Sequence, residues 1–243
     1  MSLHVHLVPS LAGLATGSPV TVAGAEAHHA VAVRRLGVGE PVALTDGAGA
    51  WATCEVTGTG KQRLEVVVRS LTSVPRPEPG LVVVQALPKG DRGELAVEML
   101  TEVGVARIVP WAASRSVSVW RGERAEKSLA RWRATAREAA KQARRAWFPE
   151  VAPLAATADV IALVRAAPVA LVLHEEAGEP LPDTVADGTV VVVGPEGGLA
   201  PEELAAFAEA GAVPVRLGAE VLRTSTAGVA AVAALLSRTP RWR

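Results

Sequence analysis

The stretch VVVVGPEGGLAPEELAAF, residues 190–207, decides the class of fold. Four consecutive valines are typical of a strand that is buried on both faces of a sheet. A glycine-rich turn follows, and Pro201 then opens a segment of helical periodicity that stops at Gly211. A strand, a turn and a helix in this order predict a parallel α/β sheet, with Glu196 in a turn at its carboxyl edge.

The same alternation continues on both sides of this stretch. We expect strands at 81–87, 106–112, 168–175 and 212–218, and helices at 93–104, 123–147 and 227–238. In the longest of these helices Leu129, Trp132 and Ala136 fall on one stripe, which favours a helix with one buried face. Thr224 or Ser225 is expected to cap the last helix. Strands that alternate with helices predict a mostly parallel sheet covered on both faces.

The N-terminal part of the chain has a different pattern. Residues 3–73 contain short β-prone runs broken by Gly and Asp, with one helix at about 25–36. The stretch SVPRPEPG, residues 73–80, has three prolines and no apolar period, as in a semi-rigid linker. We therefore expect two domains, a small β-barrel at 1–74 and an α/β domain at 75–243.

Composition narrows the class of protein. A hydrophobic content of 49% and a charged content of 21% suit a globular protein with a core. A single cysteine, Cys54, excludes an internal disulfide and suits a reducing cytoplasm, and we expect it to be a small strand residue. The first 17 residues have no basic region typical of a secretory signal, and the apolar run 224–237 is too short to span a bilayer. No His or Cys cluster has the spacing of a metal site, so we expect neither a metal nor a membrane partner.

Charge is unevenly distributed along a chain whose formal net charge is zero. Residues 115–145 carry ten Lys or Arg and three Glu, whereas residues 171–210 carry nine acidic residues and no Lys or Arg. A concentrated basic stretch predicts local binding of a polyanion such as nucleic acid. A solvated helix face is an equally valid interpretation of the same stretch.

Three segments are expected at the carboxyl ends of strands, where open α/β sheets bind ligands: 171–178, 191–198 and 215–228. A glycine-rich turn before a helix favours an anion, but the carboxylate of Glu196 repels a phosphate. The ligand is therefore expected to be neutral or positive near this turn, or to approach it with hydroxyl groups. In the alternative interpretation, Glu196 accepts hydrogen bonds from the N–H groups of its own turn. No complete dinucleotide or P-loop motif is present.

At these residues the chain resembles a known family. GPEGGLAPEE (194–203), followed by LGAEVLRTSTA (217–227), resembles the paired C-terminal motifs of the ribosomal RNA small-subunit methyltransferase E family, in the knotted SPOUT class. HHAVAVRRLGVGEPVALTDGAGAWATCEV (28–56) is similar to the PUA-like RNA-binding domain of this family. Residues 87–117 and 130–145 are similar to its middle section, so the resemblance runs over nearly the whole chain.

The resemblance implies a fold and an activity. The fold is a C-terminal α/β SPOUT domain with a parallel sheet and a trefoil knot around 170–230, after a small PUA-like β-barrel. The activity is methylation of N3 of one uridine in the small-subunit (16S) ribosomal RNA with S-adenosylmethionine, by a cytoplasmic homodimer. The positions that match the cofactor pocket are Leu173, His174, Gly194, Pro195, Glu196, Gly197, Gly198, Leu217, Gly218, Leu222, Arg223 and Thr224.

Two residues are candidates for catalysis. Arg223 is placed to stabilise a developing uridine anion, or alternatively to tie the loops together through backbone carbonyls. Glu196 is a second candidate, as a general base if its carboxylate is shielded from water. The candidate phosphate contacts are Arg34, Arg35, Lys89, Arg92, Arg115, Arg144 and Arg145. The chain departs from the family pattern at Met99, Lys141, Ala200 and Ser225.

Two other functions remain open. The first is an RNA-binding factor for ribosome assembly that has this fold without catalysis. The second is a SPOUT methyltransferase that acts on another RNA. The apolar C-terminal helix is compatible both with a dimer interface and with burial inside the subunit.

Overall fold

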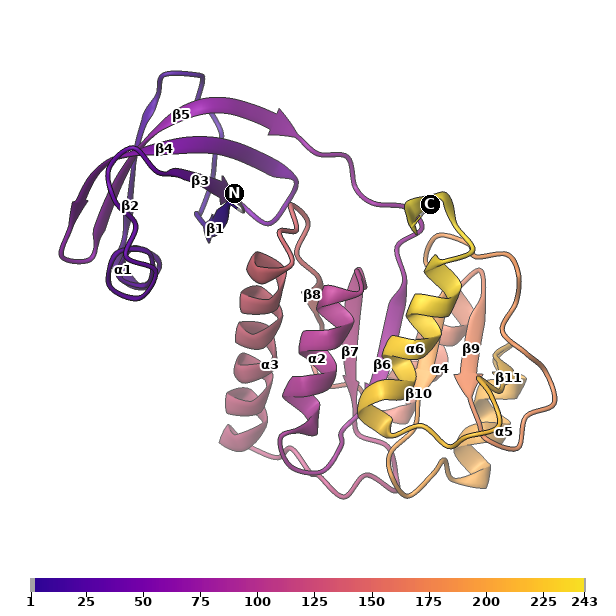
Figure 1. Cartoon of the computed structure of the whole chain (residues 1–243). Helices are drawn as coiled ribbons and strands as arrows, with labels where there is room; N and C mark the ends of the chain where they lie inside the picture. The colour runs from indigo at the N-terminus through magenta and orange to yellow at the C-terminus, as the bar shows by residue number, and fades with distance from the viewer. Residues whose placement is uncertain (1–2, 243) are drawn as a thin grey trace. The chain divides into compact units, whose positions relative to one another are not determined.

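The computed structural model describes residues 3–242, which form two compact units (Figure 1). The first unit contains the chain up to Arg76 together with Ala140–Phe148. The second unit contains Pro77–Ala139 and the chain from Pro149 onward. The first unit is therefore discontinuous in sequence, and residues 140–148 are its second segment.

A five-stranded sheet forms the first unit, with strand order β1-β3-β4-β5-β2. Its strands are β1 (His4–Leu7), β2 (Pro19–Ala23), β3 (Pro41–Thr45), β4 (Ala50–Gly60) and β5 (Arg63–Ser73). β1 and β3 are parallel and the other pairs are antiparallel. The sheet curls into a half-barrel around a core that includes the fully buried Val42, Leu44 and Leu64 (Figure 1). The helix α1 (Gly24–His28) and a π-helical turn (His29–Val33) add Ala27 and Ala30 to this core. The expected small β-barrel fold with one helical segment is confirmed, and Cys54 is a buried residue of β4.

Residues 140–148 complete the first unit through backbone and side-chain contacts. The Gly49 N–H donates to Ala146 O at 3.0 Å, and the Phe148 N–H donates to Gly47 O at 2.9 Å. The Trp147 indole N–H donates to Val74 O at 2.8 Å. A Cβ atom at Gly49, where φ is +103°, would lie 2.6 Å from Trp147 Cζ2, so only glycine fits beneath this ring.

The second unit is built on a six-stranded sheet in which every strand pair is parallel. Its strands are β6 (Val82–Ala86), β7 (Arg107–Trp111), β8 (Glu150–Val151), β9 (Ala170–Leu173), β10 (Val190–Val193) and β11 (Val213–Val215). Their order is β11-β9-β10-β6-β7-β8. Because β10 lies in the interior of the sheet, its four valines are buried, as the sequence predicts.

Helices cover both faces of this sheet. α2 (Arg92–Glu102), α3 (Glu123–Gln142) and α6 (Thr224–Leu236) pack on the face that includes Val191 and Val193. α4 (Thr157–Ala166) and α5 (Pro201–Glu209) pack on the face that includes Val190 and Val192. A 3₁₀ turn, Pro240–Trp242, follows α6. This division between alternate valines is the two-residue period of a strand. The predicted parallel sheet with helices on both faces is confirmed.

Three details differ from the sequence prediction. The helix expected at 123–147 ends at Gln142, because Arg144 adopts a left-handed backbone conformation with φ of +54°. Thr224 and Ser225 are not caps: α6 begins at Thr224, and Arg223 occupies the N-cap without a side-chain hydrogen bond. The short β8 and the helix α4 were not predicted.

The C-terminal helix α6 is packed inside the second unit. Ala231, Val232, Leu235 and Leu236 are fully buried in the core that α2 shares. Gly228 lies so close to the sheet that an added Cβ would be 3.2 Å from Val193 Cγ2. Burial within the subunit is therefore confirmed for this face of the helix. Within the described residues, no helix is both long enough and apolar enough to cross a membrane.

Candidate functional site

The three predicted loops meet at the carboxyl edge of the six-stranded sheet, as expected for a parallel α/β fold. They line a cleft of about 900 Å³ and an adjoining pocket of about 100 Å³ that share Leu173, His174 and Leu222. The predicted cofactor residues that line the cleft are Leu173, His174, Gly194, Pro195, Glu196, Gly197, Gly198, Leu222, Arg223 and Thr224. Leu217 and Gly218 line the adjoining pocket. The structure thus brings all twelve positions together around one depression.

The glycine-rich turn is tightly packed against its surroundings. Gly198 has a φ of +71°, and its N–H donates to Pro195 O at 3.0 Å, which closes the turn. A Cβ at Gly194 would lie 3.1 Å from Leu199 Cγ, and one at Gly197 would lie 3.1 Å from Arg115 O. These approaches explain the glycines at 194 and 197, and the positive φ explains the glycine at 198. The turn therefore presents backbone rather than side chains to the cleft at these three positions.

Glu196 projects from this turn and is exposed. Its Oε1 accepts a hydrogen bond of 3.1 Å from the backbone N–H of Lys89, in the loop between β6 and α2. The carboxylate thus joins two loops of the cleft, rather than accepting from its own turn as the alternative interpretation proposed. Its exposure gives no shielding from water, which the role of general base requires. Binding of a ligand hydroxyl or cation is the role that this position supports better.

Arg115 and Arg92 are the predicted RNA-contact residues that line the cleft. Arg115 Nη1 donates to Leu199 O at 3.2 Å, with a longer contact of 3.5 Å to Gly197 O. Arg115 therefore holds the glycine-rich turn in place, a structural role that the sequence did not indicate. Lys89, a third predicted contact, is in the β6–α2 loop that precedes Arg92, and it contributes the backbone N–H that binds Glu196.

Glu203 anchors the helix that follows the turn. This buried carboxylate accepts from the Ala200 N–H at 3.3 Å, from the Ser114 N–H at 2.9 Å and from Thr157 Oγ1 at 3.0 Å. Ala200 lacks a capping side chain, and Glu203 satisfies its backbone N–H instead. The start of α5 is thereby fixed relative to the neighbouring loop at Ser114.

Arg223 occupies the N-cap of α6 at the rim of the cleft. Its backbone carbonyl accepts from the N–H groups of Thr226 and Ala227, both at 2.9 Å. Within the described part of the chain we find no hydrogen bond or ion pair of its guanidinium. The proposed tie to backbone carbonyls is therefore absent, and the positive charge remains available to a ligand in the cleft.

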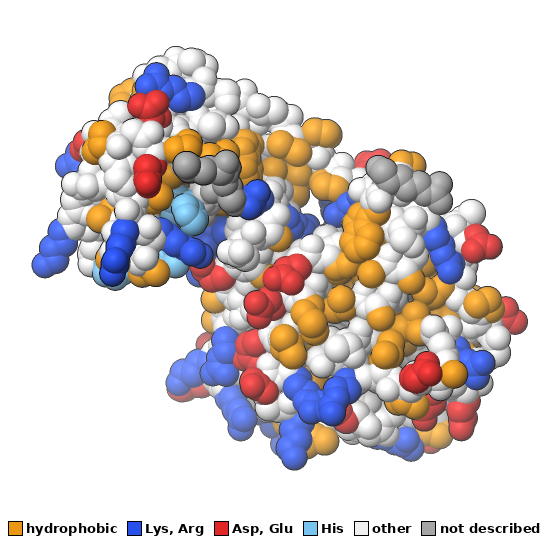
Figure 2. Space-filling model, viewed as in Figure 1, with side chains coloured by type: hydrophobic (Ala, Val, Ile, Leu, Met, Phe, Trp, Pro, Cys, Tyr) orange, Lys and Arg blue, Asp and Glu red, His pale blue; other side chains and the backbone are white. Residues whose placement is uncertain are grey.

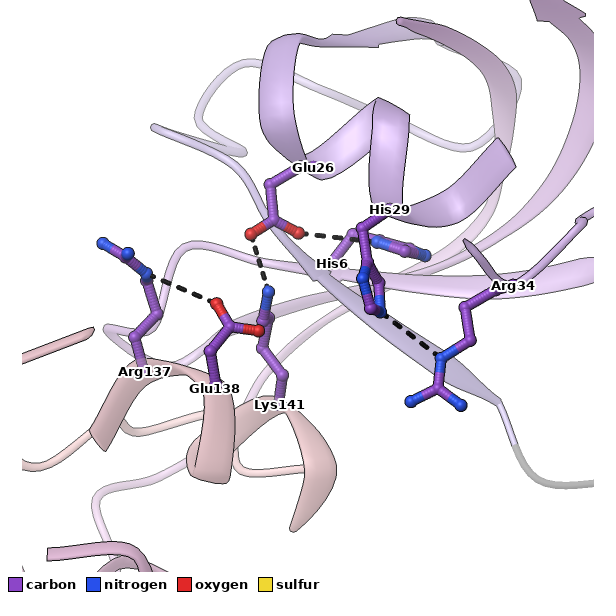
Figure 3. Close-up of polar contacts among 7 residues, drawn as sticks. All are labelled: His6, Glu26, His29, Arg34, Arg137, Glu138 and Lys141. Atoms are coloured by element: carbon purple, nitrogen blue, oxygen red, sulfur yellow. Dashed lines mark hydrogen bonds and ion pairs between the residues drawn. The ribbon is translucent and has the colours of Figure 1, made fainter. Parts of the chain in front are cut away.

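The remaining predicted RNA contacts, Arg34, Arg35, Arg144 and Arg145, belong to the first unit. Arg34 Nε lies 3.3 Å from His29 Nε2 (Figure 3). Arg35 and Arg144 both have positive φ, at 56° and 54°, so each marks the end of a helical segment. None of the four lines the cleft of the second unit.

A polar cluster in the first unit joins α1, β1 and residue 141. Lys141 Nζ donates to Glu26 Oε1 at 2.7 Å, and His6 Nδ1 lies 3.5 Å from Glu26 Oε2 (Figure 3). Burial raises the pKa of Glu26. His6 and the Lys141 ammonium together lower this pKa by more than burial raises it, so its net value is about 2. Lys141 is thus a structural ion-pair residue, although the sequence gave it only as a departure from a family motif.

Residues that the sequence did not single out also line the cleft. They include Glu175, Glu176, Leu204 and Val221. Three of these four lie within the predicted loop segments 171–178 and 215–228, so their position in those loops was an available signal. Together with Glu196, these residues line the cleft with both carboxylates and apolar side chains.

This donor set suits S-adenosylmethionine better than a nucleotide phosphate. The carboxylates of Glu175, Glu176 and Glu196 complement a sulfonium, an ammonium or ribose hydroxyls, and they repel a phosphate. The side chains of Leu204 and Leu222 offer apolar surface for an adenine ring. Among residues 3–242 no cluster of His, Cys, Asp and Glu suits a metal ion.

Comparisons with known proteins agree with this geometry. Residues 76–236 match the family described as an RNA methyltransferase domain, and residues 22–69 match an RNA methyltransferase PUA domain. The ribosomal RNA small subunit methyltransferase E of Mycobacterium tuberculosis is 47% identical over 234 residues, which cover 93% of this chain and 89% of that protein. Its counterpart from Bacillus subtilis is 30% identical, with 90% of both chains covered.

A solved structure gives the same result in three dimensions. The ribosomal RNA small subunit methyltransferase E of Neisseria gonorrhoeae, bound to S-adenosylmethionine, superposes with a TM-score of 0.86. It is 28% identical and covers 97% of this chain and 98% of its own. The aligned residues therefore include nearly all of both units.

Proposed function

Because this chain belongs to the ribosomal RNA small subunit methyltransferase E family, we propose that it methylates N3 of one uridine in the small-subunit ribosomal RNA. It is an RNA methyltransferase that uses S-adenosylmethionine. The observation that carries the specific proposal is the convergence of three loops on one cleft with carboxylates and with Arg223, whose guanidinium has no partner among residues 3–242. The names of the related proteins give small-subunit ribosomal RNA as their substrate.

The chemistry requires a pyrimidine nitrogen close to a methyl donor. S-adenosylmethionine, when bound, supplies a methyl group that its sulfonium activates. Glu196 and the glycine-rich turn bind and orient the ligand, and well-oriented reactants avoid a large entropic cost. Release of the uridine N3 proton to solvent water leaves negative charge on the ring, which the Arg223 guanidinium stabilises at the rim. The target base reaches the cleft from a single-stranded or flipped-out position.

Three finer features belong to the same proposal. The enzyme acts in the cytoplasm, where ribosomal subunits are found. It forms a homodimer, a proposal supported by the exposed apolar Val221 and Leu222 and by hydrophobic side chains over α6 (Figure 2). The proposed knot lies at about 170–230. It is supported by two hydrogen bonds that hold the β9–β10 loop: the Arg216 N–H donates to Glu179 O, and Arg238 Nη1 donates to Leu181 O.

The proposed function is tested by nucleoside mass spectrometry of small-subunit RNA incubated with the protein and labelled S-adenosylmethionine. We expect one labelled 3-methyluridine per RNA, at a single mapped position. Label in a different nucleoside, or in a different RNA, would contradict the proposed target. A protein that binds the RNA but has no measurable affinity for S-adenosylmethionine would favour the assembly-factor function instead.

A double substitution in the first unit tests the RNA path. Replacing Arg144 by Asn and Arg145 by Gln removes two candidate phosphate contacts, and Asn tolerates the positive φ at 144. We expect the slope of log affinity against log salt for RNA binding to fall by about 1.4, because fewer counterions are released.

The matched control for this test removes the same charge from another part of the first unit. Arg63 and Arg69 are exposed and pair with Glu65 and Glu55 on the strands β4 and β5. Replacing both by Gln is expected to leave the salt slope closer to its original value. Equal slopes in the two double variants would place the RNA path away from Arg144 and Arg145.

A further inference from the structure

A second cavity, of about 460 Å³, lies in the second unit at the same edge of the sheet. Its walls come from the β6–α2 loop and the first turn of α2, from Ser118 and Trp120, and from the first half of α3. No described residue lines both this cavity and the cofactor cleft. Its volume is within the range of about 300–1,000 Å³ that is typical of sites for small organic groups.

Three cations of α3 face this cavity. Arg124, Lys127 and Arg131 are three or four residues apart and so share one face of the helix. Arg131 Nη1 lies 3.2 Å from Glu94 Oε1, and Lys127 Nζ lies 3.6 Å from Glu123 Oε2. Among the described residues Arg124 has no ion pair, so the wall keeps one uncompensated positive charge. Figure 2 shows Lys and Arg side chains gathered with acidic ones along the lower left of the second unit.

Two tryptophans form the aromatic wall. The rings of Trp120 and Trp132 pack edge to face, with centroids 5.1 Å apart and planes at 83°. Trp132 is buried, and a Cβ at Gly93 would lie 2.9 Å from its Cζ2 and Nε1 atoms. The α2 backbone and Trp132 therefore fix the position of Trp120, which is only half-buried at the cavity. Partly exposed aromatic rings such as Trp120 are surfaces on which nucleic-acid bases stack.

The two depressions are lined by different residues of the same two stretches of chain. Arg92, the first residue of α2, lines the cofactor cleft, and the Lys89 N–H of the β6–α2 loop donates to Glu196. Leu87, Pro88 and Gly90 of the same loop line the second cavity. In the segment that follows β7, Arg115 lines the cleft and Trp120 lines the second cavity. The second cavity is therefore the neighbouring compartment on the same edge, one loop away from the cleft.

We propose that this cavity binds a nucleotide that flanks the methylated one in the RNA. Its base stacks on Trp120, and its phosphate is held by Arg124 with help from Lys127 and Arg131. The inference rests on the proposed function, because a flanking nucleotide exists only if the substrate is RNA. Arg124 and Trp120 thus select single-stranded RNA whose neighbouring base is free to leave the stack.

The test uses methylation kinetics on a small-subunit RNA fragment in which each nucleotide flanking the target uridine is replaced in turn by an abasic residue. With the wild-type protein, one abasic position is expected to raise KM about tenfold, the loss of one stacking contact. Trp120→Leu is expected to raise KM on the intact fragment by a similar factor. The abasic penalty then disappears in that variant, because the two changes remove the same contact.

Two further variants separate this site from changes in folding. Arg124→Gln removes an exposed charge and is expected to lower the salt slope of RNA binding by about 0.7. Arg137→Gln removes an exposed charge from the same helix outside the cavity, and its KM on the intact fragment is expected to stay at the wild-type value. The affinity for S-adenosylmethionine is expected to be equal in all of these proteins.

An abasic penalty of the same size in wild type and Trp120→Leu would overturn the proposed nucleotide site. So would a wild-type KM and salt slope in Arg124→Gln. Activity of the wild type on the intact fragment tests the proposed function separately. An inactive wild type contradicts both proposals, whereas an active wild type with an unchanged penalty contradicts the nucleotide site alone.

Discussion

Replacing Arg223 by Ala is expected to lower the rate of methyl transfer by about 10²- to 10³-fold at saturating substrates, the usual effect of removing one fixed donor to a developing anion. The guanidinium lies at the rim of the cleft and has no partner among the described residues. Its backbone, not its side chain, accepts the hydrogen bonds that begin α6. The substitution therefore removes charge from the reacting region without loosening the helix. Single-turnover transfer of labelled methyl groups to small-subunit RNA measures the effect.

Two companion variants make this result specific. Arg223→Lys keeps the positive charge but loses the planar fork, so it is expected to recover part of the rate. Glu196→Gln is expected to raise the dissociation constant of S-adenosylmethionine, with a smaller effect on the rate at saturation. A wild-type single-turnover rate in Arg223→Ala would remove Arg223 from the mechanism. A fall in the thermal stability of Arg223→Ala would instead support a structural role for Arg223.

Replacing Lys141 by Met is expected to destabilise the first unit by about 3 kcal/mol, because it leaves a partly buried carboxylate without its cation. Lys141 is 9% exposed and the Glu26 side chain 21%. The double variant Glu26→Gln with Lys141→Met is expected to be less destabilised than Lys141→Met alone, since no unpaired charge remains. Hydrogen exchange of the β3–β5 amides reports the stability of this unit.

The same ion pair gives the first unit a defined acid sensitivity. The pKa of Glu26 is lowered from 4.5 to about 2, so its contribution is present above about pH 4.5 and is lost as the pH falls towards 2. At most about 3 kcal/mol of the free energy of unfolding is lost in this pH range, and the double variant Glu26→Gln with Lys141→Met is expected not to show this loss. The exposed ion pair Arg63–Glu65 is the control for this ion pair. Arg63→Gln is expected to lower the free energy of unfolding by less than about 1 kcal/mol. An equal acid response in wild type and double variant would contradict the role of Glu26.

Much of the second unit was predictable because its signals are local. The valines 190–193 are apolar at every position, which only a strand covered on both faces requires. Pro201 and Gly211 bound α5 by their own backbone preferences. Because the carboxyl ends of parallel strands meet at one edge of the sheet, the sequence also predicts that the three loops lie together.

Other features depend on contacts between residues far apart in sequence. No local signal near Glu196 pointed to its partner, the Lys89 N–H, which is 107 residues away. Arg115 was a reasonable candidate for RNA, yet its guanidinium holds Leu199 O of the glycine-rich turn. For α4 the signal was present but weak: Asp159 accepts from the Ala156 N–H, and Pro168 follows the helix.

The end of α3 shows the same limit. Residues 136–146 are rich in Ala, Arg and Lys, all good helix formers, so their sequence favours continuation. The helix ends at Gln142 instead, because the residues that follow bond to Gly47, Gly49 and Val74 of the first unit. Tertiary contacts here override the local preference.

That return of residues 140–148 has a consequence for biosynthesis. Translation releases the first 76 residues well before the stretch that supplies Trp147 and Lys141 to them. The nascent half-barrel therefore lacks the partners of Gly49 and of the Glu26 carboxylate until residues 77–147, 71 further residues, have been synthesised. A proteolytic or genetic cut at the proline-rich linker would separate this unit from its own final piece.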